Sequence, residues 1–166
     1  MNAELLYKKM LEALRLRAQQ GAFEIAGLAI GGDWIAERLA QDLGLPHFGV
    51  INVAFHRDDY AEKGMTALRT ASTMTTHLPF DVNGANVILI DDVLFTGRTV
   101  RAALNELFDF GRPAKVELMV LADRGHRELP VCANFVGETT VVSDDQILVL
   151  QKNDAGQFDF VLEERE

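Results

Sequence analysis

Two adjacent aspartates and two threonines around a glycine are the residues whose types and spacing most clearly predict chemistry. Asp91 and Asp92 follow four apolar residues, and Thr96, Gly97 and Thr99 come a few positions later. Carboxylates accept hydrogen bonds from sugar hydroxyls or hold a cation, whereas threonine hydroxyls and backbone N–H groups donate to phosphate oxygens. A diol on the aspartates and a monophosphate on the loop together describe a site for ribose 5-phosphate.

A strand, a short loop and the start of a helix must position these side chains. The short β-branched run at residues 87–90 predicts a fully buried strand. After the loop, apolar residues recur at helical spacing, at Val100, Ala103, Leu104, Leu107 and Phe108. This order of elements suits phosphate, because the free N–H groups and the positive dipole end of a helix N-terminus face the anion. Gly97 lets the backbone close around a phosphate oxygen.

Two better-known phosphate loops are excluded by the residues around Gly97. A Walker A loop needs a lysine beside the last glycine, and none is present. A Rossmann fingerprint needs three glycines, and Gly97 is the only one in this loop. The alternative without function is a buried strand whose two aspartates cap the next element.

The composition is that of an ordinary globular chain, and its 166 residues predict one domain, 1–166, with a substantial core. The formal net charge of −9 argues against non-specific nucleic-acid binding over the whole surface, although a local basic patch stays compatible with it. A single cysteine, Cys132, excludes an intramolecular disulfide, so we expect a cytoplasmic location. We expect Cys132 to be a small core residue, and we expect no membrane association because no 18-residue apolar run occurs.

The first half of the chain predicts two helices and two strands around a glycine pair. Residues 3–20 predict an amphipathic helix whose buried face would hold Leu5, Leu6, Met10, Leu11, Leu14 and Leu16. Strands are predicted at residues 23–30 and 49–55, and Gly31 and Gly32 follow the first of them. Asp33 is the expected N-cap of a helix that reaches Leu43. The glycine pair is either a tight turn or a loop that approaches a ligand closely.

The second half predicts a long loop, a further strand and a C-terminal hairpin. Residues 60–78 show no firm periodicity, which is typical of a functional loop or of a solvated surface hairpin. A buried strand at 115–121 ends in the loop 123–130, a candidate site for a second substrate because ligands bind at the carboxyl ends of parallel strands. Residues 147–152 and 157–162 alternate around a turn and predict a β-hairpin.

The segment 86–99 resembles the phosphoribosyl pyrophosphate (PRPP) motif of type I phosphoribosyltransferases, in which an apolar run, two acids, small residues, Thr-Gly and a further Thr follow in this order. Over nearly the whole chain the sequence is similar to the PyrR family, pyrimidine operon attenuators with uracil phosphoribosyltransferase activity. The similarity lies in the run 87–104, in Gly-Arg-Pro at 111–113, in Leu-Ala-Asp-Arg-Gly-His-Arg-Glu-Leu-Pro at 121–130 and in Arg-Asp-Asp at 57–59.

The resemblance implies an α/β fold with a central, mostly parallel sheet, helices on both sides and a flexible hood at about 56–80. It implies conversion of uracil and PRPP to UMP and pyrophosphate, with Mg²⁺ as the cofactor held by Asp91 and Asp92. The 5-phosphate would lie on the loop that comprises Val93, Leu94, Phe95, Thr96, Gly97, Arg98 and Thr99. Gly31, Gly32 and Arg57 would contact the pyrophosphate, with Arg57 counted as catalytic beside Asp91 and Asp92, and Asp123 and Arg124 would lie near the base. We also expect a homo-oligomer.

Two departures from the family pattern keep alternatives open. Many members carry Thr-Arg-Gly in the pyrophosphate loop, where this chain has Ile30-Gly31-Gly32 before Asp33. The segment 137–145 holds three acids and no base, whereas RNA-regulating relatives are basic there. The alternatives are a UMP-sensing, RNA-binding regulator, a nucleotide-binding protein with residual catalysis, and a phosphoribosyltransferase for purine bases.

Overall fold

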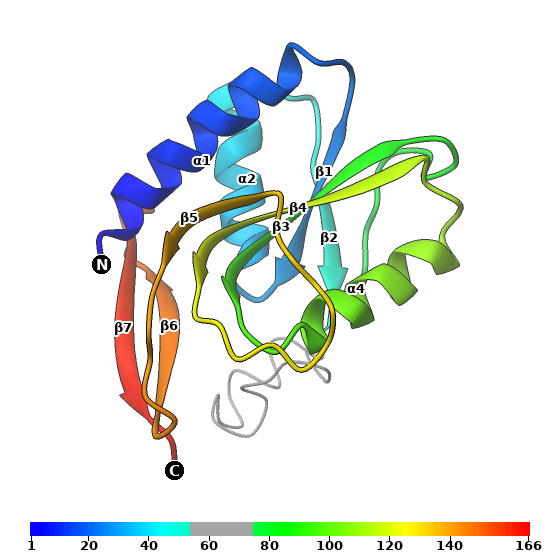
Figure 1. The fold of residues 1–166 in the computed structure, drawn as a ribbon. Coiled ribbons are helices and arrows are strands. Elements are labelled where there is room, and N and C mark those ends of the chain that lie inside the picture. The colour runs from blue at the N-terminus through cyan, green and yellow to red at the C-terminus, as the bar shows by residue number, and fades with distance from the viewer. Residues whose placement is uncertain (54–74) are drawn as a thin grey trace.

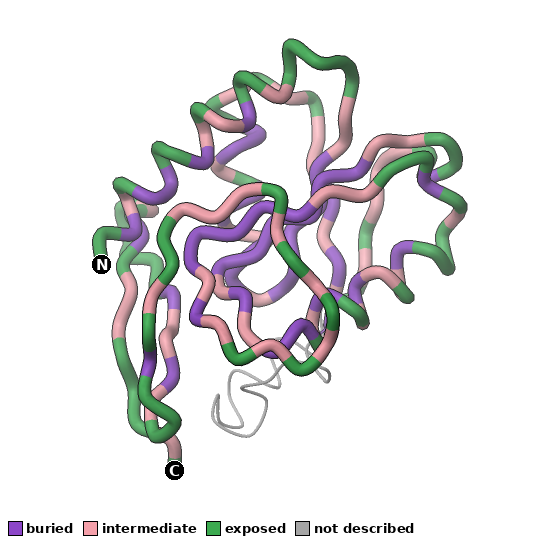
Figure 2. Tube along the Cα trace, viewed as in Figure 1, coloured by how far each residue is buried: buried purple, intermediate pink, exposed green. Residues whose placement is uncertain are grey.

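Five parallel strands form the central sheet of the computed structural model, which describes residues 1–53 and 75–166 (Figure 1). Their order across the sheet is β2-β1-β3-β4-β5, and each neighbouring pair is parallel. The strands are β1 (Glu24–Ala29), β2 (Gly49–Asn52), β3 (Asn86–Leu94), β4 (Lys115–Asp123) and β5 (Phe135–Thr139). Buried residues gather along the central strands (Figure 2), as expected for a parallel sheet covered on both faces.

Helices cover both faces of this sheet. The helices α1 (Ala3–Ala18) and α2 (Gly32–Leu43) pack on one face, where they share a core with Ile88 and Ile90 of β3. The helix α4 (Arg98–Asp109) packs on the other face against Val87 and Leu89. The alternation along β3 follows from its pleat, which points successive side chains to opposite faces. The expected α/β fold with a mostly parallel sheet is confirmed. None of the helices in the described ranges is long and apolar enough to cross a membrane.

A separate antiparallel hairpin, β6 (Gln146–Lys152) and β7 (Phe158–Glu164), confirms the predicted C-terminal hairpin. It lies beside the N-terminal end of α1 (Figure 1). Phe158 packs edge-on to Tyr7 with 5.7 Å between the ring centroids, and the Arg38 guanidinium lies over the Tyr7 ring at 4.0 Å. Glu4 joins the cluster through a 2.8 Å ion pair with Arg38. Burial, together with a hydrogen bond to Asp42, raises the pKa of Tyr7 above its usual value.

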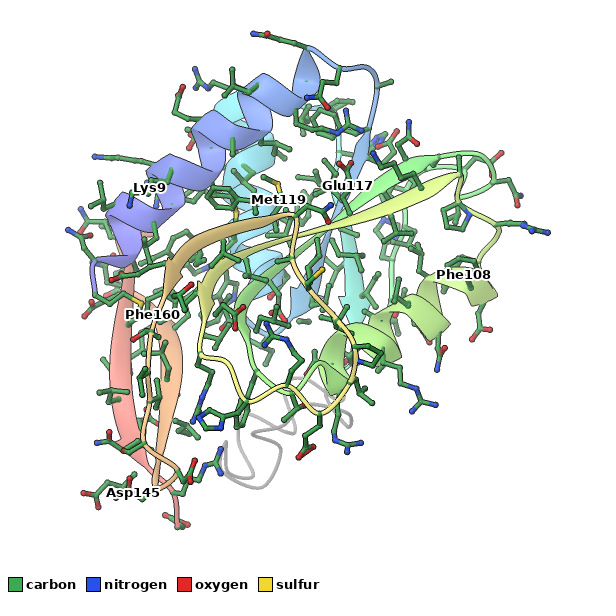
Figure 3. The ribbon with its side chains drawn as sticks, viewed as in Figure 1. Lys9, Phe108, Glu117, Met119, Asp145 and Phe160 are labelled. Atoms are coloured by element: carbon green, nitrogen blue, oxygen red, sulfur yellow. The ribbon has the colours of Figure 1, made fainter. Side chains whose placement is uncertain are left out.

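Several residues that the sequence pattern suggested for the core are exposed instead. Leu5 and Leu16 are 50% and 63% exposed, because at about 100° per residue they lie opposite the face that carries Leu6, Met10 and Leu14. Phe108, at the end of α4, is also exposed (Figure 3). Cys132 is exposed rather than in the core, since it follows β4 in a surface loop.

Some element boundaries also differ from the expectations. The helix α2 begins at Gly32 with Gly31 as its N-cap, so Asp33 lies inside the first turn instead of capping it. The strand β2 ends at Asn52, and most of the expected hood at 56–80 lies outside the described residues. Within its described end, His77 forms an antiparallel bridge with Val50.

Candidate active site

The two aspartates of the motif lie within β3 rather than after it. The ladder with β4 continues past them, pairing Asp91 with Val120 and Leu94 with Asp123. Their exposures are only 2% and 4%. The Asp92 amide donates to Asp91 Oδ1 at 2.9 Å, and the Val93 amide donates to Asp92 Oδ1 at 2.8 Å. Backbone donors therefore fix the orientation of both carboxylates before any ligand arrives.

The phosphate loop turns from β3 into α4 at Thr96 and Gly97. Gly97 is the N-cap of α4 with φ 97°, a conformation that favours glycine, and Thr96 Oγ1 accepts from the Arg98 amide at 3.2 Å. The Thr96 carbonyl accepts from the amides of Glu128 and Leu129, which belong to the loop after β4. The start of α4 and the loop after β4 are thus held together, as their paths in Figure 1 show.

The glycine pair after β1 packs directly against the aspartates. A Cβ atom on Gly31 would lie 2.5 Å from Asp92 Oδ2, and a Cβ on Gly32 would overlap the carbonyl oxygen of Ile90. Gly31 also has φ 119°, and the Ala29–Ile30 peptide bond, one bond before the Ile30–Gly31 bond, is cis. Only glycine allows this approach, so the structure brings together the two loops that the sequence assigned to pyrophosphate and to ribose 5-phosphate.

Asp123, at the end of β4, forms a two-pronged ion pair with Arg127. The two Oδ atoms of Asp123 lie 3.0 and 2.6 Å from the guanidinium, and the Gly125 amide adds a hydrogen bond at 2.9 Å. Burial disfavours the charged carboxylate, but these donors outweigh it and hold the pKa of Asp123 below its usual value. Arg127 also donates to the Phe95 carbonyl at 2.6 Å. The observed role of Asp123 is to anchor this loop, and its contact with a base stays a prediction.

Arg124 is buried beside the phosphate loop. Its guanidinium carbon lies 3.9 Å from the centroid of the Phe95 ring, and Nη1 donates to the carbonyl of Gln146 in the hairpin. Arg165 approaches the same ring at 5.6 Å, and the His126 ring lies edge-on to it at 6.4 Å. Arg124 therefore lies against the Phe95 ring of the phosphate loop, and its place near a base stays a prediction.

Arg165 was not predicted from the sequence. Its amide donates to the carbonyl of Asp145 at 2.8 Å, which fixes the C-terminal tail at the end of the hairpin marked by Asp145 in Figure 3. It belongs to no motif, so only the packing of the hairpin brings it to Phe95.

The role of Arg57 and the binding of a magnesium ion stay predictions. Arg57 lies outside the described residues. Within residues 1–53 and 75–166, no group of three or more His, Cys, Asp or Glu side chains is placed to hold a metal ion by itself. A magnesium ion that also binds substrate phosphates needs only one or two protein carboxylates, so this finding is compatible with a metal at Asp91 and Asp92.

Two cavities of about 350 and 420 Å³ lie elsewhere, beside the hairpin. Trp34, Arg38 and Gln157 line the first, and Glu4, Asn153 and Gln157 line the second. Side chains of both charge signs line each of them. The candidate site is instead located by the convergence of the loops after β1, β3 and β4.

Comparison with known proteins agrees with this geometry. A family model described as the phosphoribosyl transferase domain matches residues 2–151. A purine phosphoribosyltransferase from Pyrococcus horikoshii is 25% identical with a TM-score of 0.59, over 81% of this chain and 80% of that one. A hypoxanthine phosphoribosyltransferase of Trypanosoma cruzi shares the fold, with a TM-score of 0.62 at 16% identity, over 100% of this chain and 95% of that one. Fold and site together define the type I phosphoribosyltransferase class.

Similarity to curated relatives identifies one family within this class. A protein named Bifunctional protein PyrR from Ralstonia nicotianae is 50% identical over 158 residues, covering 93% of this chain and 88% of the relative. A protein of the same name from Nitrosococcus oceani is 41% identical, covering 95% and 90%. The chain belongs to the PyrR family of phosphoribosyltransferases.

Proposed function

We propose that this chain is a uracil phosphoribosyltransferase that converts uracil and PRPP to UMP and pyrophosphate. In this reaction the bond from ribose C1 to pyrophosphate breaks, a bond from C1 to a uracil nitrogen forms, and the proton of that nitrogen leaves to solvent. The observation that supports the proposal is the close approach of Gly31 to Asp92, because the glycine pair is the candidate pyrophosphate loop and Asp92 is a candidate ligand of the ribose.

Each loop has a distinct task in this proposal. Asp91 and Asp92 accept hydrogen bonds from the ribose hydroxyls, and the first turn of α4 with Thr96 holds the 5-phosphate. Gly31 and Gly32 allow the pyrophosphate to approach the backbone. Fixing both ends of PRPP supplies orientation, which accounts for much of the rate acceleration in reactions of this kind.

The residues present fit a magnesium ion that is shared with the substrate. Asp91 and Asp92 are consecutive residues whose carboxylates are buried and oriented by backbone donors, and carboxylate oxygens are the ligands that Mg²⁺ prefers. When bound, the ion would neutralise charge on the departing pyrophosphate. Arg57, which the family resemblance assigns to the same group, would add positive charge.

Uracil as the base rests on the resemblance of residues 121–130 to the PyrR family. A panel of uracil, cytosine, hypoxanthine and guanine with PRPP and Mg²⁺ tests this choice, and we expect nucleotide formation with uracil alone. Preferential use of a purine base would contradict the proposal and favour a phosphoribosyltransferase for purine bases.

Asp91→Asn and Asp92→Asn should each lower the rate of UMP formation at least about 100-fold, by analogy with the loss of one preorganised electrostatic contact. Asp109→Asn is the control, since Asp109 is exposed, and it should leave the rate unchanged.

A second candidate function is a UMP-sensing, RNA-binding regulator. The observation that favours it is the word "Bifunctional" in the names of both relatives. Against it, the acids Glu138, Asp144 and Asp145 would repel RNA phosphates. A gel-shift titration with the leader RNA of a pyrimidine operon tests it: binding that strengthens with UMP and weakens with salt supports this role, and a flat response to UMP excludes it.

A further inference from the structure

The side chain of Asp33 accepts a hydrogen bond from the Gly31 amide, a donor that we would expect a pyrophosphate to use. Its Oδ1 accepts a hydrogen bond from the Gly31 amide at 2.9 Å, from within the first turn of α2. The N-terminus of a helix attracts an anion through its free N–H groups and its dipole. In this chain the attracted anion is a side chain of the helix itself.

Two acidic side chains, Asp33 and Asp92, lie beside this loop. Burial raises the pKa of Asp33, hydrogen bonds from the amides of Gly31, Asp33 and Trp34 oppose that rise, and the charge of Asp92 adds to it. Asp92 Oδ2 occupies the space beside Gly31 where a Cβ would lie. Two carboxylates therefore lie close to Gly31, and a third anion there meets repulsion from both.

We propose that Asp33 competes with the pyrophosphate group for the Gly31–Gly32 loop, so that it weakens the binding of PRPP and pyrophosphate without weakening that of UMP. This inference rests on the proposed function, because that function assigns pyrophosphate to this loop. UMP carries a phosphate for the α4 loop and none for the Gly31 loop. Asp33 thereby sets the preference of the site between a nucleoside monophosphate and a pyrophosphate-bearing ligand.

The variant Asp33→Asn tests this assignment, since its amide oxygen still accepts from the Gly31 amide while its charge is lost. Calorimetric titrations of the full chain with Mg²⁺ and PRPP, Mg²⁺ and pyrophosphate, or UMP provide the measurement. We expect the Kd for PRPP and for pyrophosphate to fall about tenfold, because the repulsion from one nearby like charge is removed. We expect the Kd for UMP to change less than about twofold, because UMP makes no contact with this loop.

A matched control and a second variant make the outcomes distinct. Glu37→Gln removes the same charge one turn further along α2 from an exposed side chain, and it should leave all three Kd values unchanged. Asp33→Ser, which removes the charge and keeps a hydroxyl oxygen that can accept a hydrogen bond, should reproduce the gain and covers a folding failure of Asp33→Asn.

Weaker pyrophosphate binding by either Asp33 variant would overturn the inference, since it would make Asp33 a ligand rather than a competitor. Equal gains for UMP and pyrophosphate, or an equal gain with Glu37→Gln, would also overturn it. If wild type and variants bind neither UMP nor PRPP, the proposed function fails first. If all of them bind UMP and the Asp33 variants leave pyrophosphate binding unchanged, only the inference about Asp33 fails.

Discussion

At the scale of single residues, the candidate site depends on two close contacts, one steric and one electrostatic. Gly31 touches Asp92, and Asp123 is bound to Arg127 by both of its carboxylate oxygens. The first contact determines how near the two candidate ligand loops come to each other. The second determines how the loop after β4 lies beside the phosphate loop, because Arg127 also holds the Phe95 carbonyl.

Gly31→Ala should abolish PRPP binding and lower the free energy of unfolding by about 2–4 kcal/mol, because the new Cβ meets Asp92 and the backbone has φ 119°. Urea unfolding and calorimetry measure the two effects. Gly21→Ala is the control, since Gly21 has φ 129° with nothing within 4 Å of a Cβ. An equal cost at both positions would mean that backbone conformation, and not the contact with Asp92, explains the loss.

Asp123→Asn should lower the free energy of unfolding by about 1–3 kcal/mol at pH 7, the range for a charge-assisted hydrogen bond to a partly buried group. The pKa of Asp123 is lowered in the folded state, so its stabilisation is fully present above the unfolded value near 3.9 and is lost as pH falls through the folded value. Urea unfolding at pH 7, and at steps below pH 4, should therefore show the difference from wild type shrinking. A difference that stays constant down to the lowest pH at which both proteins fold would contradict this account.

At the scale of elements, α2 links the site to the C-terminal hairpin. Its first residues form the glycine loop, and Arg38 on the same helix packs over Tyr7 and Phe158. Glu4 completes the link, since it binds Arg38 and also accepts from the Phe158 amide at 2.7 Å. The hairpin therefore supports the helix that carries the candidate pyrophosphate loop.

Phe158→Ala should lower the free energy of unfolding by about 3–5 kcal/mol, because the ring is 4% exposed and its removal leaves a cavity between α1 and the hairpin. Phe110→Ala, where the ring is 48% exposed, should cost less than about 1 kcal/mol. Thermal or urea unfolding of both variants makes the comparison. Equal costs would show that the hairpin does not stabilise the described core.

Element prediction from the sequence succeeded where the pattern was long and regular. The buried strand at 87–90 and the helix after Gly97 are confirmed as parts of β3 and α4. The strand β5 was not predicted, because its five residues include Gly137 and are half-buried or exposed at the sheet edge, which leaves neither a strong alternation nor an apolar run. The continuation of β3 through Asp91 and Asp92 was also missed, since charged residues look like the end of a strand until β4 pairs with them.

At the scale of the whole molecule, the parallel order of the sheet places the ends of β1, β3 and β4 at one edge (Figure 1). Ligands of open α/β sheets bind at such an edge. The sequence predicts that the Gly31 loop and the loop after Asp92 each follow a strand. In a parallel sheet this is enough to predict that the two loops lie near each other. The position of Arg165 did not follow, because it depends on how the hairpin packs beside the sheet. Sequence patterns thus predict the loops that follow strands, while contacts made by the C-terminal tail require the structure.

The most direct test of the central claim is the stoichiometry of the reaction of the full chain with uracil, PRPP and Mg²⁺. We expect equal amounts of UMP and pyrophosphate, with no pyrophosphate released when uracil is omitted and a loss of both products in Asp92→Asn. Pyrophosphate release that does not depend on uracil, or UMP formation that persists in Asp92→Asn, would contradict it.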